Sequence, residues 1–315
     1  MEQKTYFVNK LMEWGSIEKR PMPWKNERDP YRIWLSEVIL QQTRVAQGLE
    51  YYNQFIAEFP TIFDLAAADV DKVMKLWQGL GYYSRARNLH FAANQIVDKY
   101  DGAFPTDIVE IKKLKGIGDY TAAAVLSFAF NLPYAVVDGN VYRVLSRFFN
   151  IELPIDSTDG IKYFKTLAQE LIPSDNARLY NQAIMDFGAL ICKPKLAQCL
   201  NCNLSAQCQA YQLQKVEKLP IKEKKITTKF RYLHYLHLMD ENGSTFMKQR
   251  LKQDIWQLLY EFPLLETDEE LTQEVTVAST MNWLSENSIG AENQYDISQV
   301  TQYYKHQLTH QKLFV

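Results

Sequence analysis

Apolar residues recur at intervals of three and four along the first two thirds of the chain, which predicts a series of amphipathic or buried helices. Asp29 and Pro30 open one of these helices as an N-cap and a first helical residue. No convincing β-hairpin signal interrupts the series, so the N-terminal part is expected to be all-α. The predicted helices span residues 4–19, 31–46, 69–77, 108–115, 119–130, 141–149, 160–171 and 180–188.

A different pattern begins after a Lys-rich segment, residues 216–229, that reads as a linker. Residues 230–239 alternate as a strand, Asn242 and Gly243 mark a hairpin turn, and residues 245–249 return. The chain is therefore expected to hold a helical domain over residues 1–215 and a second, strand-containing domain over residues 230–315. A length of 315 residues, 47% of them apolar, is enough for two cores.

Charge and hydropathy narrow the class of protein. The formal net charge of -2 excludes a polybasic nucleic-acid binder, although a local basic face is compatible with it. The first residues contain no apolar signal-peptide core, and no apolar run reaches the ~18 residues of a membrane span. We expect a cytoplasmic protein without membrane contact, a monomer, and cysteines that are not paired in disulfides.

A glycine turn, Gly116-Ile117-Gly118, separates two of the predicted helices. Glycine permits a sharp turn and a close approach of the backbone to a ligand, and the next helix starts at once with unpaired N–H groups. Such a helix start binds anions, for example one phosphate of a nucleic-acid backbone. An ordinary helix–helix turn is the alternative for this pattern taken alone.

Four cysteines gather within 17 residues at the spacing C-x6-C-x2-C-x5-C. Four thiols in so short a segment of a reduced protein indicate a metal ion or a metal cluster. Zinc is the alternative to a cluster, but structural zinc sites usually draw on two closely spaced pairs, and this segment has one C-x2-C. The four residues are Cys192, Cys199, Cys202 and Cys208.

Two further segments carry candidate chemistry. Glu37 lies among apolar residues of the predicted helix 31–46, where burial would hold its proton more tightly, although an exposed glutamate is the commoner case. Residues 79–87, GLGYYSRAR, combine flexible glycines with flat tyrosines and basic arginines. This mixture suits an extruded base or an inserted wedge in nucleic acid, unless Tyr82 and Tyr83 only pack on a neighbouring helix.

Several of these segments together resemble known DNA repair enzymes. Residues 114–122, LKGIGDYTA, and 137–144, VDGNVYRV, are similar to the helix–hairpin–helix DNA glycosylase superfamily, with the hairpin at residues 107–130. The run WLSEVILQQT that contains Glu37 resembles the MutY adenine DNA glycosylases, and the cysteine loop 192–208 resembles the 4Fe-4S loop of endonuclease III and MutY. The resemblance implies base-excision removal of adenine mispaired with 8-oxoguanine or guanine in double-stranded DNA.

The resemblance also implies roles for individual residues. Glu37 would protonate adenine, Asp138 would stabilise the sugar cation, and Tyr120 and Asn140 would orient Asp138. Gly116 and Gly118 would bind the DNA backbone, and Gln42, Leu80 and Tyr82 would fill the gap in the base stack. The adenine pocket would include Trp24 and Gln182. One 4Fe-4S cluster would be bound by Cys192, Cys199, Cys202 and Cys208.

Tyr120 distinguishes between the alternatives. Endonuclease III enzymes have a lysine here, whose amine forms a Schiff base and cuts the strand, and a phenol cannot do this. A monofunctional glycosylase is therefore expected. The alternatives are a glycosylase/lyase like endonuclease III and a catalytically silent, cluster-bearing DNA-binding module; both Glu37 and Asp138 being present argues against the latter.

The C-terminal segment IWQLLYEFP, residues 255–263, resembles part of the MutT-like (Nudix-fold) α/β domain of MutY enzymes. No Nudix box of clustered glutamates is present, so pyrophosphate hydrolysis is not expected, and the domain is expected to be incomplete at Val315. Leu308, Thr309 and His310 match the family's hairpin that reads 8-oxoguanine, which would use a hydroxyl, an imidazole and an apolar wedge.

Overall fold

Two units make up the chain, Met1–Lys224 and Lys225–Val315. They are seen in a computed structural model that describes residues 2–17, 22, 24–223, 228–271, 273–286, 303–308 and 310–315. The first part of the predicted linker belongs to the first unit, because Leu219 is buried there and its carbonyl accepts a hydrogen bond from Arg147.

The described residues of the first unit form helices and turns without a strand. The elements are α1 (Glu2–Ile17), α2 (Pro30–Leu40), α3 (Val45–Glu58), α4 (Ile62–Ala67), α5 (Val70–Leu76), α6 (Ser84–Tyr100), α7 (Ile108–Ile111), α8 (Asp119–Phe130), α9 (Gly139–Phe148), α10 (Thr158–Leu171), α11 (Ala177–Leu190), η1 (Cys199–Asn201), η2 (Ser205–Gln207), α12 (Gln209–Gln212) and η3 (Val216–Lys218).

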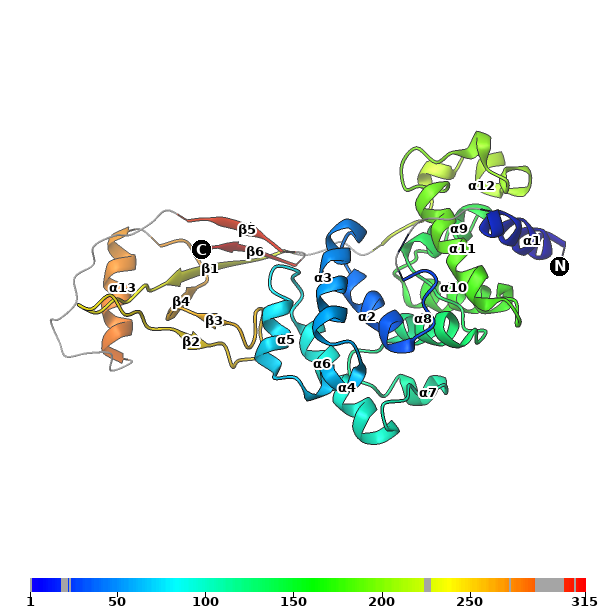
Figure 1. Ribbon diagram of the computed structural model, residues 1–315. Helices are drawn as coiled ribbons and strands as arrows, with labels where there is room; N and C mark the ends of the chain where they lie inside the picture. Colours follow the sequence, from blue (N-terminus) through cyan, green and yellow to red (C-terminus); the bar gives the residue numbers. More distant parts are fainter. Residues whose placement is uncertain are drawn as a thin grey trace. The chain divides into compact units, whose positions relative to one another are not determined.

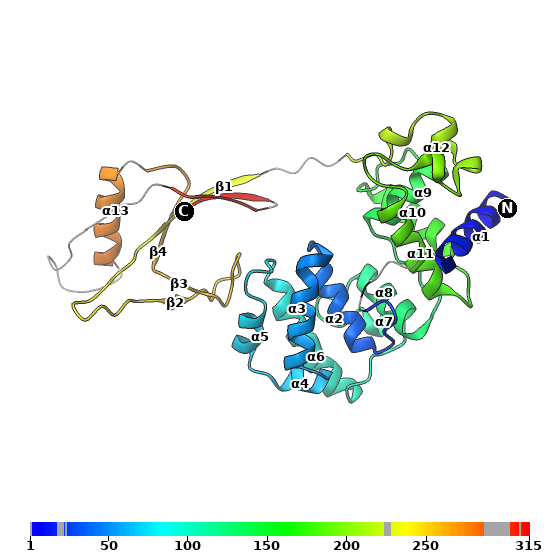
Figure 2. The same cartoon turned by 45° about the horizontal axis from the view of Figure 1, so that its top comes forward.

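These helices pack as two lobes (Figures 1 and 2). In one lobe α2 packs on α3 and α6, and α6 also contacts α4 and α5; in the other, α9 and α11 pack together with α1 and α12. Helix α8 joins the lobes because it contacts both α2 and α11, and every residue from Thr121 to Phe128 is buried. Its small side chains allow this close packing on two sides, which fixes the lobes around one centre.

Most predicted helices are present, but two are shorter than the sequence indicates. The predicted helix 31–46 is wrong beyond Leu40: α2 ends there, Gln42 has a φ of 57°, and α3 starts at Val45. A positive φ cannot continue a right-handed helix. The predicted helix 108–115 holds only as Ile108–Ile111, and the chain then turns toward Gly116.

Strands dominate the second unit, with β1 (Lys229–Tyr235), β2 (Lys248–Gln249), β3 (Tyr260–Glu261), β4 (Leu264–Thr267), α13 (Gln273–Glu286), β5 (Lys305–Gln307) and β6 (Gln311–Phe314). Four strands form a sheet in the order β4-β1-β6-β5, in which β1 and β6 are parallel and the other pairs antiparallel. The predicted hairpin is correct in its turn but not in its pairing: Met239 and Thr245 form one isolated bridge, while β2 pairs with β3.

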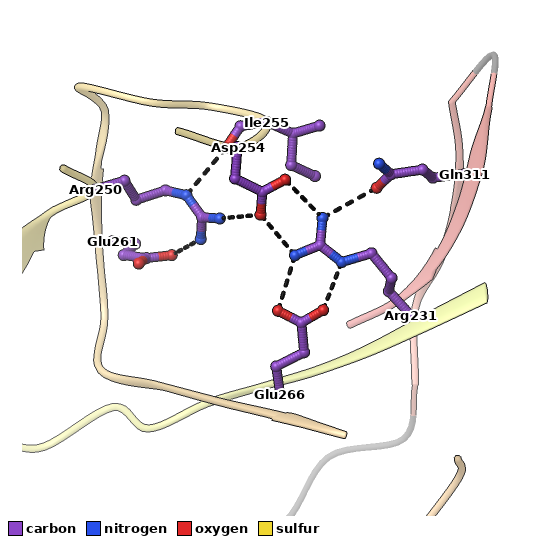
Figure 3. Close-up of polar contacts among 7 residues, drawn as sticks. All are labelled: Arg231, Arg250, Asp254, Ile255, Glu261, Glu266 and Gln311. Carbon is purple, nitrogen blue, oxygen red and sulfur yellow. Dashed lines mark hydrogen bonds and ion pairs between the residues drawn. The ribbon is translucent and has the colours of Figure 1, made fainter. Parts of the chain in front are cut away.

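A cluster of paired charges, with two arginines whose side chains are largely buried, lies at the sheet of the second unit (Figure 3). Arg231 is 6% exposed and forms two hydrogen bonds of 2.6 and 2.8 Å with Glu266 and a third of 2.6 Å with Asp254. Arg250 bonds Asp254 at 3.1 Å and also pairs with Glu261. Each guanidinium therefore pairs with two carboxylates, and this attraction compensates for the free energy lost when the charge is removed from water.

Candidate functional site

A cavity of about 750 Å³ lies in the first unit, lined by residues of α2, α8, α9 and α11. It includes the two candidate catalytic carboxylates, Glu37 and Asp138, which are separated by 101 positions in the chain. Tyr120 and Asn140 also line it. The packing of α8 and α9 on neighbouring helices thus brings all four predicted catalytic residues to one place.

Glu37 lies in the interior of α2 and is 9% exposed. Its Oε2 accepts a hydrogen bond of 2.8 Å from the hydroxyl of Tyr120. Burial raises the pKa of Glu37 to about 7; the Tyr120 hydrogen bond opposes this shift and the nearby Asp138 adds to it. A large fraction of Glu37 is therefore protonated near neutral pH, as a general acid requires.

Asp138 is the N-cap of α9, and its position is fixed by two hydrogen bonds. Oδ1 accepts from the backbone N–H of Val141 at 2.8 Å, and Oδ2 accepts from the Asn140 amide at 2.7 Å. Burial raises the pKa of Asp138, while these donors and the charge of Arg143 act against that rise. Asn140 thus contacts Asp138, the residue that the family resemblance implies it orients.

Tyr120 has a different partner from the expected one. Its hydroxyl donates to Glu37 rather than to Asp138, because α8 packs on α2 and turns this ring toward the buried carboxyl. Burial and the two carboxylates raise the pKa of Tyr120 well above its usual value. The phenol stays protonated and remains a donor to Glu37.

Two residues that support Asp138 were given no role from the sequence. Arg143 donates to the Asn140 carbonyl oxygen Oδ1 at 2.8 Å and to the backbone carbonyls of Cys192 and Gly188, both at 2.7 Å. Gly188 brings α11 against α9, since a Cβ there would lie 2.6 Å from the Cβ of Asn140. The sequence signals for Arg143 were its place in the run VDGNVYRV and its spacing of three residues from Asn140 on one helix.

The predicted adenine pocket residues, Trp24 and Gln182, both line the cavity. The amide Nε2 of Gln182 donates to Asp186 at 3.1 Å, and Asp186 also pairs with Lys25 at 3.0 Å. Because its Nε2 is held by a carboxylate, the acceptor Oε1 is the atom of Gln182 left to meet a donor in the cavity. Lys25 and Asp186 are further residues that sequence reasoning missed.

The predicted wedge residues differ in exposure. Gln42 is exposed in the turn after α2, and Tyr82 is 46% exposed in the loop before α6. Leu80, in contrast, is only 6% exposed, because the loop folds over Trp77. Leu80 could therefore enter a base stack only if this loop opened.

The glycine turn has the backbone geometry expected of it. Gly116 has a φ of 78°, and a Cβ there would meet the side chain of Asn88 at 2.8 Å. Gly118 is the N-cap of α8 and has no neighbour within 4 Å of a Cβ position. The space beside Gly118, at the start of α8, is therefore open, as an anion site at a helix start requires.

The four cysteines line one small cavity, together with Val144, Arg147 and Phe187 among others. None of them is in a disulfide, and the Arg147 guanidinium donates to the sulfur of Cys192 at 3.5 Å. Within the residues that the structure describes, no three His, Cys, Asp or Glu side chains converge as a site for a single metal ion.

Of the C-terminal candidates, Leu308 and His310 lie between β5 and β6. The N–H of Leu308 donates to the carbonyl of Gln311 at 2.8 Å, and His310 is exposed while its carbonyl accepts from Lys229. Thr309 lies outside the described residues. Among the helices of the described part of the chain, none is both long and apolar enough to span a membrane.

Comparison with known proteins gives consistent matches. Residues 35–174 match the model of the HhH-GPD superfamily base excision DNA repair proteins. The chain is 32% identical over 312 residues to an adenine DNA glycosylase of Buchnera aphidicola subsp. Baizongia pistaciae, covering 98% of this chain and 84% of the relative. It is 40% identical over 217 residues to that of Mus musculus, covering 66% and 42%. A thermostable thymine-DNA glycosylase structure, 30% identical, has a TM-score of 0.63 over 67% of this chain and 98% of its own.

Proposed function

The chain belongs to the adenine DNA glycosylases of the HhH-GPD superfamily, and on this basis we propose that it excises adenine paired with 8-oxoguanine or guanine in duplex DNA. The observation that carries the proposal is that Glu37 and Asp138 line one cavity in different environments. Two carboxyl groups of different protonation state are what cleavage of a glycosidic bond requires.

Access to the bond comes first. The target adenine lies inside a duplex and must be flipped out, at a cost of a few kcal/mol in stacking and pairing. The exposed Gln42 and Tyr82 are suited to fill the space that the base leaves. The flipped base would enter the cavity between Trp24 and Gln182, whose Oε1 would accept from the adenine amino group.

Glu37 acts as the general acid in this proposal. Adenine leaves poorly as an anion, so a proton given to a ring nitrogen lowers the barrier to breaking the bond. The buried position of Glu37 supports the role because it keeps the proton available near pH 7. After departure of adenine, the Glu37 carboxylate would activate the water that attacks the sugar.

Asp138 stabilises the positive charge that develops on the sugar, either electrostatically or by transient bonding. Its hydrogen bonds with Val141 and Asn140 stabilise the ionised form and hold the carboxylate in place before the reaction. Tyr120, a phenol bound to Glu37, supplies no amine for a Schiff base, which supports hydrolysis without strand cleavage.

The cysteine loop is proposed to bind one 4Fe-4S cluster. A single zinc ion needs four sulfurs within about 2.3 Å of one point. The thiols of Cys192, Cys199, Cys202 and Cys208 line one shared cavity, and their spacing with a single C-x2-C supports a cluster rather than a zinc ion. A cluster bound there would cross-link the four cysteines of the loop to one another, beside Val144 and Arg147 of α9.

The second unit is proposed to be a MutT-like domain that reads the lesion. Its mixed sheet and helix α13 are compatible with an α/β fold, and the hairpin tip at Leu308 and His310 lies on an antiparallel pair of strands. We propose a location in the cytoplasm, on the nucleoid if the source is bacterial.

The proposal is tested with duplex oligonucleotides that contain adenine opposite 8-oxoguanine, guanine or thymine. We expect release of adenine from the first two, and strand breakage only after alkali. Breakage without alkali would instead identify a lyase. Tight binding to the mispairs without any release of adenine would identify a silent DNA-binding module and overturn the proposal.

A further inference from the structure

The two exposed wedge residues come from irregular backbone in separate parts of the chain. Gln42 follows the C-terminus of α2, and Tyr82 precedes α6. Their φ angles are 57° and 48°, both in the left-handed region that is unfavourable for residues with a side chain. Such conformations persist only where the surroundings hold them in place.

Arg85, in the first turn of α6, makes the contacts that hold both segments. It is 8% exposed. Its Nη1 donates to the carbonyls of Val38, Ile39 and Gln41 at 2.8, 2.9 and 2.6 Å, directly before the first wedge residue. Its Nη2 donates to the carbonyl of Gly81 at 3.1 Å, directly before the second.

Aromatic rings complete the surroundings of this guanidinium. It lies 5.0 Å from the ring centre of Trp77 and 5.5 Å from that of Tyr82. The Trp77 indole N–H donates to the same Gly81 carbonyl at 3.0 Å. Arg85 thus contacts the ring of one wedge residue, Tyr82, and the backbone directly before the other, Gln42.

The positive charge of Arg85 faces groups that carry partial negative charge. Its partners are carbonyls at the C-terminal end of α2, where the helix dipole is negative, and the faces of two rings. Burial lowers its pKa to about 10, so it stays charged at neutral pH. A lysine carries its donors on one nitrogen and lacks the planar fork by which Nη1 and Nη2 contact separate segments.

We propose that Arg85 is a positioning residue that joins Gln42 and Tyr82 into one unit, so that the two side chains enter the base stack together. This rests on the proposed function, since it assigns how the same enzyme recognises its duplex. Arg85 itself touches neither the base nor the sugar. It acts by binding the backbone of the two segments that carry Gln42 and Tyr82.

Coupling between the wedge residues is the quantity to measure. Affinity is determined for a mispaired duplex whose adenosine carries a 2′-fluorine, which resists cleavage because it destabilises the sugar cation. Gln42→Ala, Tyr82→Ala and the double variant are compared in the wild-type and Arg85→Lys backgrounds. We expect non-additive losses in the first background, within the roughly 2- to 150-fold range of contacting residues, and additive losses in the second.

The matched control is Tyr31→Phe. Tyr31 is buried on α2, the helix that ends before Gln42, and its hydroxyl donates to the carbonyl of Phe59 at 2.7 Å, away from the wedge. This variant is expected to lower the melting temperature while leaving the coupling unchanged. A merely structural role of Arg85 would give the same pattern as this control, and persistence of coupling in Arg85→Lys would overturn the inference.

A second variant keeps the test informative if Arg85→Lys fails to fold. Trp77→Phe keeps an aromatic ring in the core but removes the indole donor to Gly81. It is expected to weaken coupling between the wedge residues, and full coupling in this variant would count against the proposal. Release of adenine by the wild-type protein is measured first, so a failure of the proposed function is seen separately.

Discussion

Gly188 and Asn140 lie in contact, and a β-carbon at Gly188 would approach that of Asn140 to 2.6 Å. Real β-carbons do not come so close, so any larger residue would push Asn140 away from Asp138. The glycine carbonyl also accepts from Arg143, which holds the other end of Asn140. A position without a side chain therefore sets the geometry of the site.

Gly188→Ala is expected to lower the single-turnover rate of adenine release, because Asn140 no longer holds the Asp138 carboxylate. Overpacking typically costs ~1–3 kcal/mol of stability as well. Gly15→Ala is the control: its Cβ would lie 2.4 Å from that of Ala183, also on α11, but away from Asp138. Equal losses of rate in both variants would show that only stability matters.

Glu37→Gln is expected to reduce adenine release by ~10²–10⁴-fold, the usual contribution of general acid catalysis, with little change in mispair affinity. The variant should also be more stable above neutral pH. The pKa of Glu37 is about 7 in the folded protein and 4.5 in the unfolded chain. Ionisation of Glu37 above neutral pH therefore lowers the free energy of unfolding of the wild-type protein by about 3 kcal/mol, a loss that glutamine avoids. Near-normal turnover would exclude Glu37 as the acid.

The pH profile of the reaction follows from the same pKa. Since the acid form of Glu37 is required, the rate is expected to fall as pH rises through about 7. Tyr120→Phe removes the hydrogen bond that lowers this pKa, so its alkaline limb should move to higher pH. Single-turnover rates between pH 5 and 9 measure the alkaline limb in the wild-type protein and in Tyr120→Phe. A shift in the opposite direction would contradict the assigned hydrogen bond.

Asp254→Ala is expected to destabilise the second unit, because Asp254 pairs with both Arg231 and Arg250, and its loss leaves each arginine with one carboxylate, Glu266 or Glu261 (Figure 3). Removing one partner of a buried pair costs ~3–5 kcal/mol, and less here because Asp254 is 23% exposed. Amide hydrogen exchange in β1 is the measurement. Glu170→Gln, at an exposed pair with Lys4, should cost at most about 1 kcal/mol.

The same network gives a pH dependence of known sign. The pKa values of Asp254 and Glu266 lie below their usual values. For Asp254, burial raises the pKa, but the hydrogen bonds from Arg231 and Ile255 and the charges of the two arginines together outweigh it; for Glu266 the Arg231 hydrogen bond is the largest cause. Their contribution to stability is therefore complete above the usual carboxyl pKa and is lost as pH falls below it. Protection of β1 amides that rises with acidification would contradict this assignment.

Lesion reading is tested with Thr309→Ala combined with His310→Ala. Losing a polar contact to a base costs ~1–3 kcal/mol of discrimination. The double variant should lose preference for 8-oxoguanine over guanine opposite adenine, while the rate on bound substrate stays nearly unchanged. An unaltered preference would place lesion reading elsewhere in the chain.

The sequence was informative where the chemistry depends on side-chain type. Glu37, Asp138 and Asn140 were identified from local runs, and they do line one cavity. Their proximity could not be derived from the sequence, because 101 positions separate the carboxylates and only the packing of α2, α8 and α9 joins them. Tyr120 was placed in the site but assigned to the wrong carboxyl.

The binding of backbone carbonyls was not predicted, and Arg85, expected with Arg87 to contact phosphate, is buried instead. Arg85 and Arg143 find their partners in main-chain oxygens of other segments, and such oxygens leave no pattern in the sequence. The end of α2 was missed for a related reason. Apolar periodicity continues through residue 46, while the backbone turns at Gln42 under contacts made by Arg85.

The break in α2 restricts how this segment can change in length. Glu37 and Gln42 are five residues apart, one within the helix and the other just beyond its end. Each residue of an α-helix advances the direction of the side chains by about 100°. One inserted or deleted residue between them would turn Glu37 out of the cavity or Gln42 away from its turn. Related chains that keep this activity should therefore tolerate substitutions between Glu37 and Gln42, but no change in the number of residues that separate the two.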